Sequence, residues 1–572
     1  MHTLSETDIS RIQHLIEDAE QDLERYDTEI GAMTQLLNKL QEQRKTLHRY
    51  TDEYKSLLAP VRRLPAELIS EICAFATCPN GLRISGGYID APTLALSQTC
   101  NVWRNIVYSR PALWSCLDID LGKSTPRTMS LLQRYLDRSG NAPLTFRIYA
   151  WDLDGGDDPD ELNEDGWKML EIILSHYLQW KEATFELHWD IYAKGFHRMS
   201  SIVPRPTDWS LDRLEILNVE WTPDSLDWDP NFPDSDEKEK TFFHFFLRWP
   251  ALRSLSLDAF HSFLPFPFEK LKELRICNNC VDGSPEDIFE LCGGLEHLQL
   301  PTGYQYLGGF DGLDATHKNL KNLRSLDLGI ENDEAAIRLF EGLTVPCLTS
   351  LKVSGTVLDQ DYESWQQSFR AMLVRSKCSV ELFEFDEGFF GSDEEVLAVL
   401  KLLPRLKCLK MDLGSGFAKV FTSDLLRNLT IKDSGILATG SVSLPLLPSL
   451  THLEISLDTS LSSQDDAHEN EEGLPKPDLV ISTLGSRKPR SSTPACRLSF
   501  DSSESWSQAW TGDHAVLGLQ RVKLSANFIT PAGHDWICLT MPGLRALKQE
   551  GLGLDVAASS TRATTGTKFF RV

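Results

Sequence analysis

The chain has 572 residues, of which 41% are hydrophobic and 24% charged, and its formal net charge at pH 7 is −26. This length allows several domains or one long array of repeats, and the composition is that of a globular protein. So acidic a chain is poorly suited to the phosphate backbone, and nucleic acid is not expected as a partner. No apolar stretch approaches the roughly 18–20 residues that cross a bilayer, so no membrane is expected as a partner either.

The N-terminus and the cysteines indicate a reducing compartment. The first ten residues lack the basic and apolar regions of a secretory signal. The 12 cysteines form no disulfide framework, and several fall within apolar patterns, where a reduced thiol acts as a small hydrophobe. We therefore expect a cytoplasmic and/or nuclear protein.

Residues 1–58 carry a heptad pattern, which is typical of a long coiled-coil-like helix. The first seam contains Ile9, Ile16, Leu23, Ile30 and Leu37, and the second contains Ile12, Ala19, Tyr26, Met33, Leu40, Leu47 and Tyr54. Arg44 and Thr51 interrupt the first seam near its end. The pattern predicts a long helix but leaves two arrangements open, a homodimer through this helix and packing against the chain's own next domain.

Residues 59–116 predict a small all-α domain of two short helices. Leu64-Pro65 precedes an apolar stripe of Leu68, Ile69 and Ile72, with Phe75 further on. Proline suits the first turn of a helix. A second helix carries one apolar face, formed by Leu96, Cys100, Trp103 and Val107. So small a unit cannot bury all of this surface, and an apolar face left over on it is usually a docking face.

The composite motif LPAELISEI…L-x-L-x-x-x-C-x-x-W-R…P-x-L-W, between Leu64 and Trp114, resembles an F-box, in particular the F-box-like domains common in mushroom-forming fungi. In that family the motif binds the Skp-type adaptor of a cullin–RING (SCF-type) ubiquitin ligase. By position, the resemblance implies an adaptor-facing set of Leu64, Pro65, Leu68, Ile69, Ile72, Val102 and Trp103. The insert at 79–92, between the two helices, departs from the pattern of a compact F-box.

Residues 117–210 mix helix and strand patterns. Strands are predicted at 144–148 and 185–187, and helices at 129–136 and 167–177. We interpret this region as a linker that leads into the repeats that follow and covers their first end.

A phrase of the form L-x-x-L-x-L recurs through residues 211–457 and again in 515–550. Most copies are separated by roughly 19–32 residues, the spacing of leucine-rich repeats. The copies begin at Leu214, Leu252, Leu271, Leu295, Leu323, Leu348, Val380, Leu406, Leu426, Leu450, Leu519 and Leu544. Each unit offers one strand and a return segment and cannot bury its apolar face alone, so the units must stack. The series resembles the irregular leucine-rich repeats that accompany F-boxes, and it predicts an α/β solenoid with a parallel β-sheet.

Strand periodicity assigns the faces of this sheet. The leucines point into the solenoid, and the residues between them lie on the concave sheet face. That row mixes charges and contains few of the aromatic residues that commonly anchor interfaces. The residues that it nominates for binding an unknown protein target are Ser256, Asp258, Arg275, His297, Gln299, Asp327, Lys352 and Lys410.

Several polar segments interrupt the pattern. Residues 152–165 are acidic but lack the glycine and glutamate that a calcium-binding loop needs at fixed positions. Residues 222–240 are a second acidic insert, and 458–514 is expected to be mostly disordered, with local docking at 479–484. A basic patch at 487–490, beside the hydroxyl residues 491–493, suggests phosphorylation. The end of the chain, 551–572, is expected to be a disordered tail.

Motifs for catalysis and cofactor binding are not found in the sequence. It contains no phosphate-binding loop, dinucleotide fingerprint, nucleophile elbow or zinc-protease motif. Cys277, Cys280, Cys292 and His297 are of types that bind zinc, but the repeat geometry places Cys277 and His297 roughly 13 Å apart along the strands. We expect no cofactor, no metal and no enzymatic activity. The predicted function is the substrate-recognition adaptor of a cullin–RING ligase, and the alternative is a protein-interaction scaffold without a ligase.

Overall fold

The computed structural model describes most of the chain, apart from several segments. The main described ranges are 6–77, 81–150, 162–188, 211–221, 249–258, 266–277, 285–300, 318–330, 333–355, 362–386, 388–414, 417–431, 445–459, 473–488, 518–562 and 566–571, with a few short pieces between them. The chain divides into two compact units, one of Met1–Pro79 and Pro92–Leu113, and one of Asn80–Ala91 and Trp114–Val572.

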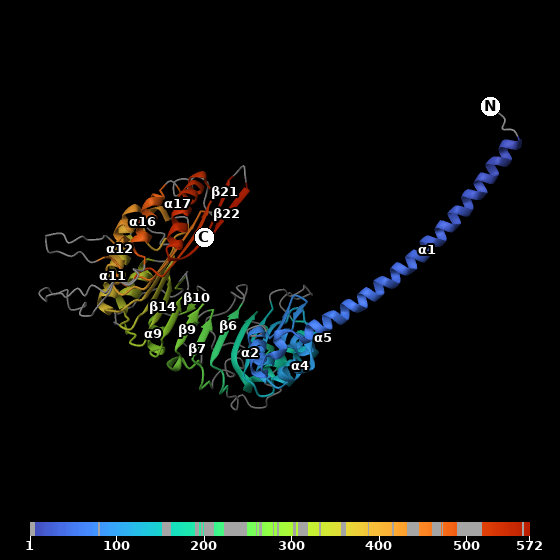
Figure 1. Ribbon diagram of the computed structural model, residues 1–572. Helices are drawn as coiled ribbons and strands as arrows, with labels where there is room; N and C mark the ends of the chain where they lie inside the picture. The colour runs from blue at the N-terminus through green and yellow to red at the C-terminus, as the bar shows by residue number, and fades with distance from the viewer. Residues whose placement is uncertain are drawn as a thin grey trace. The chain divides into compact units, whose positions relative to one another are not determined.

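The N-terminal segment is one helix, α1 (Glu6–Leu57, 52 residues), which confirms the predicted long helix (Figure 1). Both heptad seams lie exposed along it, with Ile16 51%, Leu23 62% and Leu40 53% accessible. Exposed ion pairs along the helix, such as Arg25–Asp22, contribute little to its stability. Because a sustained heptad pattern specifies a partner for its seams, α1 presents an unfilled contact surface in the single chain.

The rest of the first unit is a small group of short helices, which we call the helical hairpin. One prediction for this region is wrong. The elements of the hairpin are η1 (Pro60–Arg63), α2 (Ala66–Thr77), α3 (Pro92–Thr99), α4 (Asn101–Tyr108) and the start of η2 (Pro111–Trp114). The predicted second helix is two helices, because Cys100 adopts an extended backbone with φ −162° and ends the first of them. Helix α2 packs against both α3 and α4. The hairpin core includes Ile69, Cys73 and Val107, all buried.

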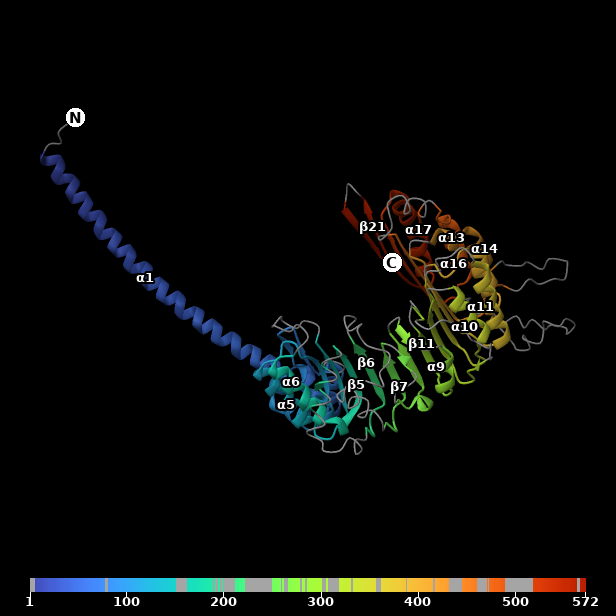
Figure 2. The ribbon, with the colours of Figure 1, turned by 180° about the vertical axis from the view of Figure 1, so that it is seen from behind.

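The second unit is built on a sheet of 17 strands, seen from opposite sides in Figures 1 and 2. The strands lie in the order β2-β1-β3-β4-β5-β6-β7-β9-β11-β14-β16-β17-β18-β19-β20-β21-β22. All neighbours are parallel except the first pair, β2–β1, and the last pair, β21–β22. The bounds are β1 (Leu82–Ser85), β2 (Tyr88–Asp90), β3 (Cys116–Asp120), β4 (Leu144–Tyr149), β5 (Trp180–Leu187), β6 (Ile216–Trp221), β7 (Ser254–Leu257), β9 (Glu273–Ile276), β11 (His297–Leu300), β14 (Ser325–Gly329), β16 (Ser350–Ser354), β17 (Leu382–Phe385), β18 (Cys408–Asp412), β19 (His452–Asp458), β20 (Arg521–Phe528), β21 (Gly553–Arg562) and β22 (Gly566–Arg571).

Ten of the predicted repeat phrases form strands of this sheet in a common register. The middle leucine of each phrase pairs with its equivalent in the next, as in the run Leu326, Leu351, Phe383, Leu409, Leu453 and Val522. These side chains are buried. The α/β architecture and the leucine-rich-repeat-like parallel sheet are therefore confirmed.

Helices form most of the return segments and lie on the outer side of the sheet (Figures 1 and 2). Their bounds are α5 (Pro126–Ser139), α6 (Glu164–Ser175), α9 (Pro285–Leu291), α10 (Asp333–Gly342), α11 (Tyr362–Ser376), α12 (Asp393–Leu400), α13 (Phe417–Val420), α14 (Ser423–Leu429), α16 (Pro477–Ser486) and α17 (Pro531–Gln549), with η3 (Tyr177–Gln179) and η7 (Phe268–Lys270) as shorter turns. Successive helices pack on one another, as α10 on α11 and α16 on α17 do. Two small sheets, β8 (Phe260–His261) with β10 (Cys280–Asp282) and β12 (Gln305–Tyr306), and β13 (Lys318–Asn319) with β15 (Leu343–Thr344), join neighbouring repeats.

Two predicted repeat strands are helices. The phrase starting at Leu426 lies in α14, and the one starting at Leu544 lies in α17. Both phrases bury their leucines against neighbouring helices, since α14 packs on α16 and α16 on α17. A spacing of three residues also fits one face of a helix, which is the physical reason for both errors.

The sheet extends beyond the predicted repeats at both ends. The described part of region 117–210 contributes to the sheet, because β3, β4 and β5 continue it in parallel. Trp114 and Trp180, both buried, occupy the place of the first leucine. The tail expected to be disordered forms β21 and β22. The strands at the end of the chain complete the ladder of β20, whose edge would otherwise be unpaired.

The insert at 79–92 forms the other end of the sheet. Strands β1 and β2 make a hairpin, and β1 pairs in parallel with β3. Gly86 and Gly87, both at positive φ (54° and 85°), form its two-residue turn, which requires this conformation at both positions. Each end of the parallel sheet is thus closed by an antiparallel strand, and Asn80–Ala91 of the insert belongs to the second unit.

Candidate protein-docking surfaces

The first candidate surface lies on α2 and α4 of the helical hairpin. On α2, Leu68 and Ile72 are 51% and 44% exposed, and on α4 Val102 is 58% exposed. Leu64 and Trp103 are half-buried, and Pro65 is exposed. Six of the seven residues predicted to face an adaptor are therefore at least partly accessible.

Ile69 is different from the other predicted docking residues. Its side chain is 4% exposed and belongs to the core of the hairpin with Cys73. Positions 68 and 69 are about 100° apart around the helix axis, and this rotation leaves Leu68 exposed while Ile69 is buried. Ile69 is therefore the buried member of the predicted set, and its contact with an adaptor stays a prediction.

Phe75 and Tyr108 are accessible apolar residues that the predicted set omits. Phe75 is the most exposed large apolar residue of α2, at 84%, and follows Leu68 and Ile72 at helical spacing. Tyr108 ends α4 and is also exposed. The three- and four-residue spacing in the sequence already placed Phe75 on the stripe, whereas the exposure of Tyr108 depends on the packing of α4.

Hydrogen bonds join α2 and α3 of the helical hairpin to the segment that follows α4. Arg110 Nη1 donates to Ser70 Oγ at 2.7 Å and to Glu71 Oε1 at 2.8 Å. Thr93 Oγ1, which is buried, donates to the carbonyl of Leu113 at 2.8 Å. Burial also raises the pKa of the Cys73 thiol, and the nearby Arg110 guanidinium offsets part of that rise. These hydrogen bonds therefore fix the positions of the helices that carry the exposed apolar residues.

The second candidate surface is a row of charged side chains across six strands, from β14 to β20. In register order the row is Asp327, Lys352, Glu384, Lys410, Glu454 and Lys523. Lys352 Nζ lies 3.8 Å from Asp327 Oδ2 and 3.5 Å from Glu384 Oε1. Lys410 Nζ lies 3.2 Å from Glu384 Oε2, and Lys523 pairs with Glu454. We call this row the charge ladder.

Three of the predicted target-binding residues belong to the charge ladder. Asp327, Lys352 and Lys410 are paired with their neighbours on adjacent strands and alternate in sign. The hydrogen bond from Lys410 to Glu384 raises the pKa of the lysine, while burial raises the pKa of Asp327. A ligand must therefore compete with these ion pairs, so the ladder offers no uncompensated charge of one sign.

The other predicted target-binding residues are spread over three strands. Ser256 and Asp258 are buried, at 5% and 4% exposure, and cannot form an open surface. Arg275 is exposed and pairs with Glu273 at 2.6 Å. His297 is exposed, and Gln299 is half-buried, both on β11. Of the eight predicted residues, Arg275 and His297 are thus the exposed ones outside the charge ladder.

The cysteines and histidine with zinc-type chemistry do not form a ligand set. Cys292 is fully buried, and burial raises the pKa of its thiol to about 12, which disfavours the thiolate that zinc binds. Cys277 Sγ instead lies 3.2 Å from Ser256 Oγ, and the side chain of Cys280 is outside the described residues. Within the described ranges no group of three histidine, cysteine or carboxylate side chains could hold a metal.

Two residues of the predicted polar segments have structural roles in the described part of the chain. Asn163, at the end of the acidic loop, accepts a hydrogen bond from the backbone N–H of Gly166 at 2.7 Å and so caps α6. Arg487, assigned from the sequence to a surface basic patch, is 2% exposed and donates to the carbonyl of Leu447 at 2.9 Å. The rest of the acidic loop (152–161), the insert 222–240 and the hydroxyl residues 491–493 lie outside the described residues.

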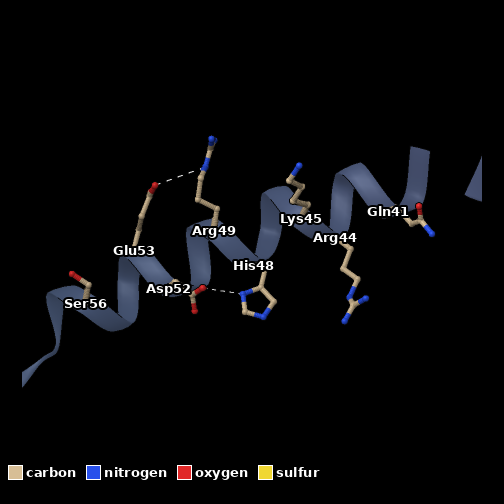
Figure 3. Close-up of a pocket in the computed structure, with 8 residues that line it drawn as sticks. All are labelled: Gln41, Arg44, Lys45, His48, Arg49, Asp52, Glu53 and Ser56. Atoms are coloured by element: carbon tan, nitrogen blue, oxygen red, sulfur yellow. Dashed lines mark hydrogen bonds and ion pairs between the residues drawn. The ribbon is translucent and has the colours of Figure 1, made fainter. Parts of the chain in front are cut away.

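A third surface is the stripe of α1. Figure 3 shows part of its basic half, where Arg44 and His48 project on one side of the helix and Lys45 and Arg49 on the other. The shallow hollow that these side chains line belongs to one exposed helix, so it has no opposite wall for a small ligand. Among the helices that the structure describes, α1 included, none is long and apolar enough to cross a membrane.

Comparison with known proteins assigns no family to this chain. A scan of the sequence against protein-family models finds no match, and a search of curated proteins finds none either.

Proposed function

We propose that this chain is the substrate-recognition subunit of a cullin–RING (SCF-type) ubiquitin ligase. The observation that carries the proposal is the set of exposed apolar residues within the F-box-like composite motif, Leu68, Ile72 and Phe75 on α2 and Val102 on α4. An exposed apolar face on so small a unit is typical of a surface that another protein covers. The partner of this face is a Skp-type adaptor, which links the chain to the cullin.

In this proposal the sheet of the second unit holds the protein target. Parallel repeat sheets present one extended face, and binding proteins of this build use it for recognition. Arg275 and His297 are its accessible predicted contacts, on β9 and β11. The chain supplies proximity, and the ubiquitin-transfer chemistry belongs to the partners.

The test is co-purification of the full chain with a Skp-type adaptor and a cullin. The wild type is expected to retain both partners. The double variant Leu68→Asp, Ile72→Asp is expected to lose both, because two carboxylates within an apolar interface leave unpaired buried charges. Both substituted residues are exposed, so folding should survive, and circular dichroism checks this.

Tyr88→Asp is the matched control, since Tyr88 is also an exposed large apolar residue (67%) but lies in the hairpin β1–β2 of the second unit. The control is expected to co-purify with the adaptor like the wild type. Retention of the adaptor by the folded double variant, or its absence from the wild type, contradicts the proposal.

A protein-interaction scaffold without a ligase is the second candidate function. It is favoured by the long exposed stripe of α1, which no ligase role requires. If this function is the right one, wild-type preparations contain partner proteins but neither adaptor nor cullin.

A further inference from the structure

The apolar stripe of α1 is wider than its two seams. Leu15, Leu36 and Tyr50 occupy the positions directly before the first seam, and they are exposed by 62%, 57% and 47%. The seams themselves are exposed along the entire helix. Any partner must therefore cover a stripe about 78 Å long, given 1.5 Å per residue over 52 residues.

The two halves of α1 carry opposite charge. The first half is acidic, with Glu17, Asp18, Glu20, Asp22, Glu24, Asp27 and Glu29. The second half is mainly basic, with Lys39, Arg44, Lys45, His48, Arg49 and Lys55. Two of the carboxylates in this half are paired within the helix, Asp52 with His48 and Glu53 with Arg49 (Figure 3). A helix with this asymmetry complements a copy of itself that runs in the opposite direction.

We propose that α1 pairs with α1 of a second copy of this chain in an antiparallel coiled coil. The inference goes beyond the ligase or scaffold function and does not depend on it. In antiparallel coiled coils a residue of the first seam faces a residue of the partner's second seam. One register overlaps the helices fully, and it pairs Ile9 with Tyr54, Ile16 with Leu47, Leu23 with Leu40 and Ile30 with Met33 of the second copy.

This register also accommodates the polar interruption of the first seam. It places Arg44 opposite Ala19 of the second copy, where the small methyl group leaves room for the long side chain. Asp18 and Glu20 flank that alanine, so the guanidinium lies beside carboxylates of the partner. At the flank of the stripe, Leu15 faces Tyr50 of the second copy, which covers apolar surface with apolar surface.

A parallel pair in register is less favourable at the same positions. It would place Arg44 against Arg44 within the seam, and Asp22 against Asp27 at the flank. Leu15 would face Glu20 of the partner. Like charges and uncovered leucines therefore disfavour this orientation.

The first experiment measures the mass of the purified full chain by sedimentation equilibrium. The wild type is expected to be a dimer of about twice 64.6 kDa. Leu23→Asp with Leu37→Asp is expected to weaken dimerisation more than about 100-fold, because it places carboxylates in the seam. Gln21→Asp with Gln35→Asp adds the same charge on the opposite side of the helix, and this control should remain dimeric.

The second experiment determines orientation by disulfide cross-linking between differently tagged copies. Antiparallel pairing predicts a cross-link between an Ile16→Cys copy and a Leu47→Cys copy, and none between two Ile16→Cys copies beyond the wild-type background. Arg44→Glu is expected to weaken the antiparallel dimer about tenfold at low salt, because it adds carboxylates beside Asp18 and Glu20. In a parallel dimer, Arg44→Glu would replace an arginine pair in the seam by a glutamate pair, so one repulsion would replace another.

Three results overturn the inference: a monomeric wild type at micromolar concentration, a cross-link between two Ile16→Cys copies, or a dimer that survives the seam substitutions. A monomer that captures a different protein through α1 also overturns it. Each of these readings is independent of adaptor binding, which the substitutions at Leu68 and Ile72 test separately.

Discussion

The backbone N–H of Gly533 donates a hydrogen bond of 3.0 Å to the carboxylate of Glu471, 62 residues earlier in the chain. Gly533 lies in the first turn of α17, while Glu471 lies in the insert expected to be mostly disordered. The same carboxylate accepts from the backbone N–H groups of Ile529 and Thr530. The buried side chain of Glu471 thus satisfies N–H groups at and just before the start of α17.

Replacing this carboxylate should destabilise the end of the repeat array. Glu471→Ala is expected to lower the free energy of unfolding by about 2–4 kcal/mol, since several buried N–H groups lose a charged acceptor. Urea titration followed by tryptophan fluorescence measures the change. Arg545→Ala, an exposed substitution on α17, should stay within about 0.5 kcal/mol of the wild type. Equal stability of the two variants would show that the cap is dispensable.

A buried cation, Arg487, directly follows α16 and satisfies backbone carbonyls at the end of α14 and in the segment before β19. Arg487 donates to the carbonyls of Leu429, Leu446 and Leu447, and burial lowers the pKa of its guanidinium to about 10. Arg487→Ala is expected to cost about 3 kcal/mol or more, because buried carbonyls lose their donors and a cavity forms.

Lys488→Ala is the comparison for Arg487→Ala. Lys488 pairs with Glu550 on the surface, so its removal should cost less than about 1 kcal/mol. If both substitutions have the same small effect in thermal unfolding, Arg487 has no structural role.

Asp386 is expected to make stability depend on pH. Burial raises the pKa of its carboxyl to about 6, and a hydrogen bond from the backbone N–H of Gly355 at 2.9 Å offsets part of the rise. The folded state binds this proton more tightly than the unfolded state does. The stabilisation is therefore fully present below the ordinary pKa of 3.8 and is lost as the pH rises through about 6.

Asp386→Asn should remove this dependence. Between pH 4 and pH 7.5, the unfolding free energy of the wild type is expected to fall by about 1 kcal/mol more than that of the variant. The difference is this small because the Asp386 side chain keeps some contact with water. Urea titrations at a series of pH values give the difference. Asp555→Asn, on the exposed side of β21, is the control. Parallel profiles for Asp386→Asn and the wild type would refute the expectation.

Reversing one charge of the ladder should reveal its contribution. Lys410 lies between Glu384 and Glu454, so Lys410→Glu brings three carboxylates together. We expect a loss of about 1–2 kcal/mol at low salt that shrinks as the salt concentration rises. Lys419→Glu, on the exposed side of α13, should cost less than about 0.5 kcal/mol. A loss that salt does not change would mean that packing, not charge, is responsible.

The elements that the sequence predicts well are those whose pattern is local. The heptads specify α1, because an apolar residue every three or four positions fits only a helix over such a length. Phrases such as that of Leu450, Leu453 and Ile455 form strands where expected, since alternate residues of β19 are buried. For the candidate docking face, helical spacing put Leu68, Ile69 and Ile72 on one stripe, of which Leu68 and Ile72 are exposed and Ile69 is buried.

Tertiary contacts decided what local spacing leaves ambiguous. Three-residue spacing fits a helix as well as a repeat phrase, and the neighbouring helices determine that Leu426 and Leu544 lie in α14 and α17. Strand β21 pairs along the free ladder of backbone groups on β20. The alternation of Leu554, Val556 and Ala558 with exposed residues fits a strand, although we expected a disordered tail here. Burial of Ile69, Asp258 and Arg487 likewise depends on residues distant in the chain. Local periodicity therefore determined which segments are regular, and long-range hydrogen bonding and packing determined their type at the ends and which side chains stay accessible.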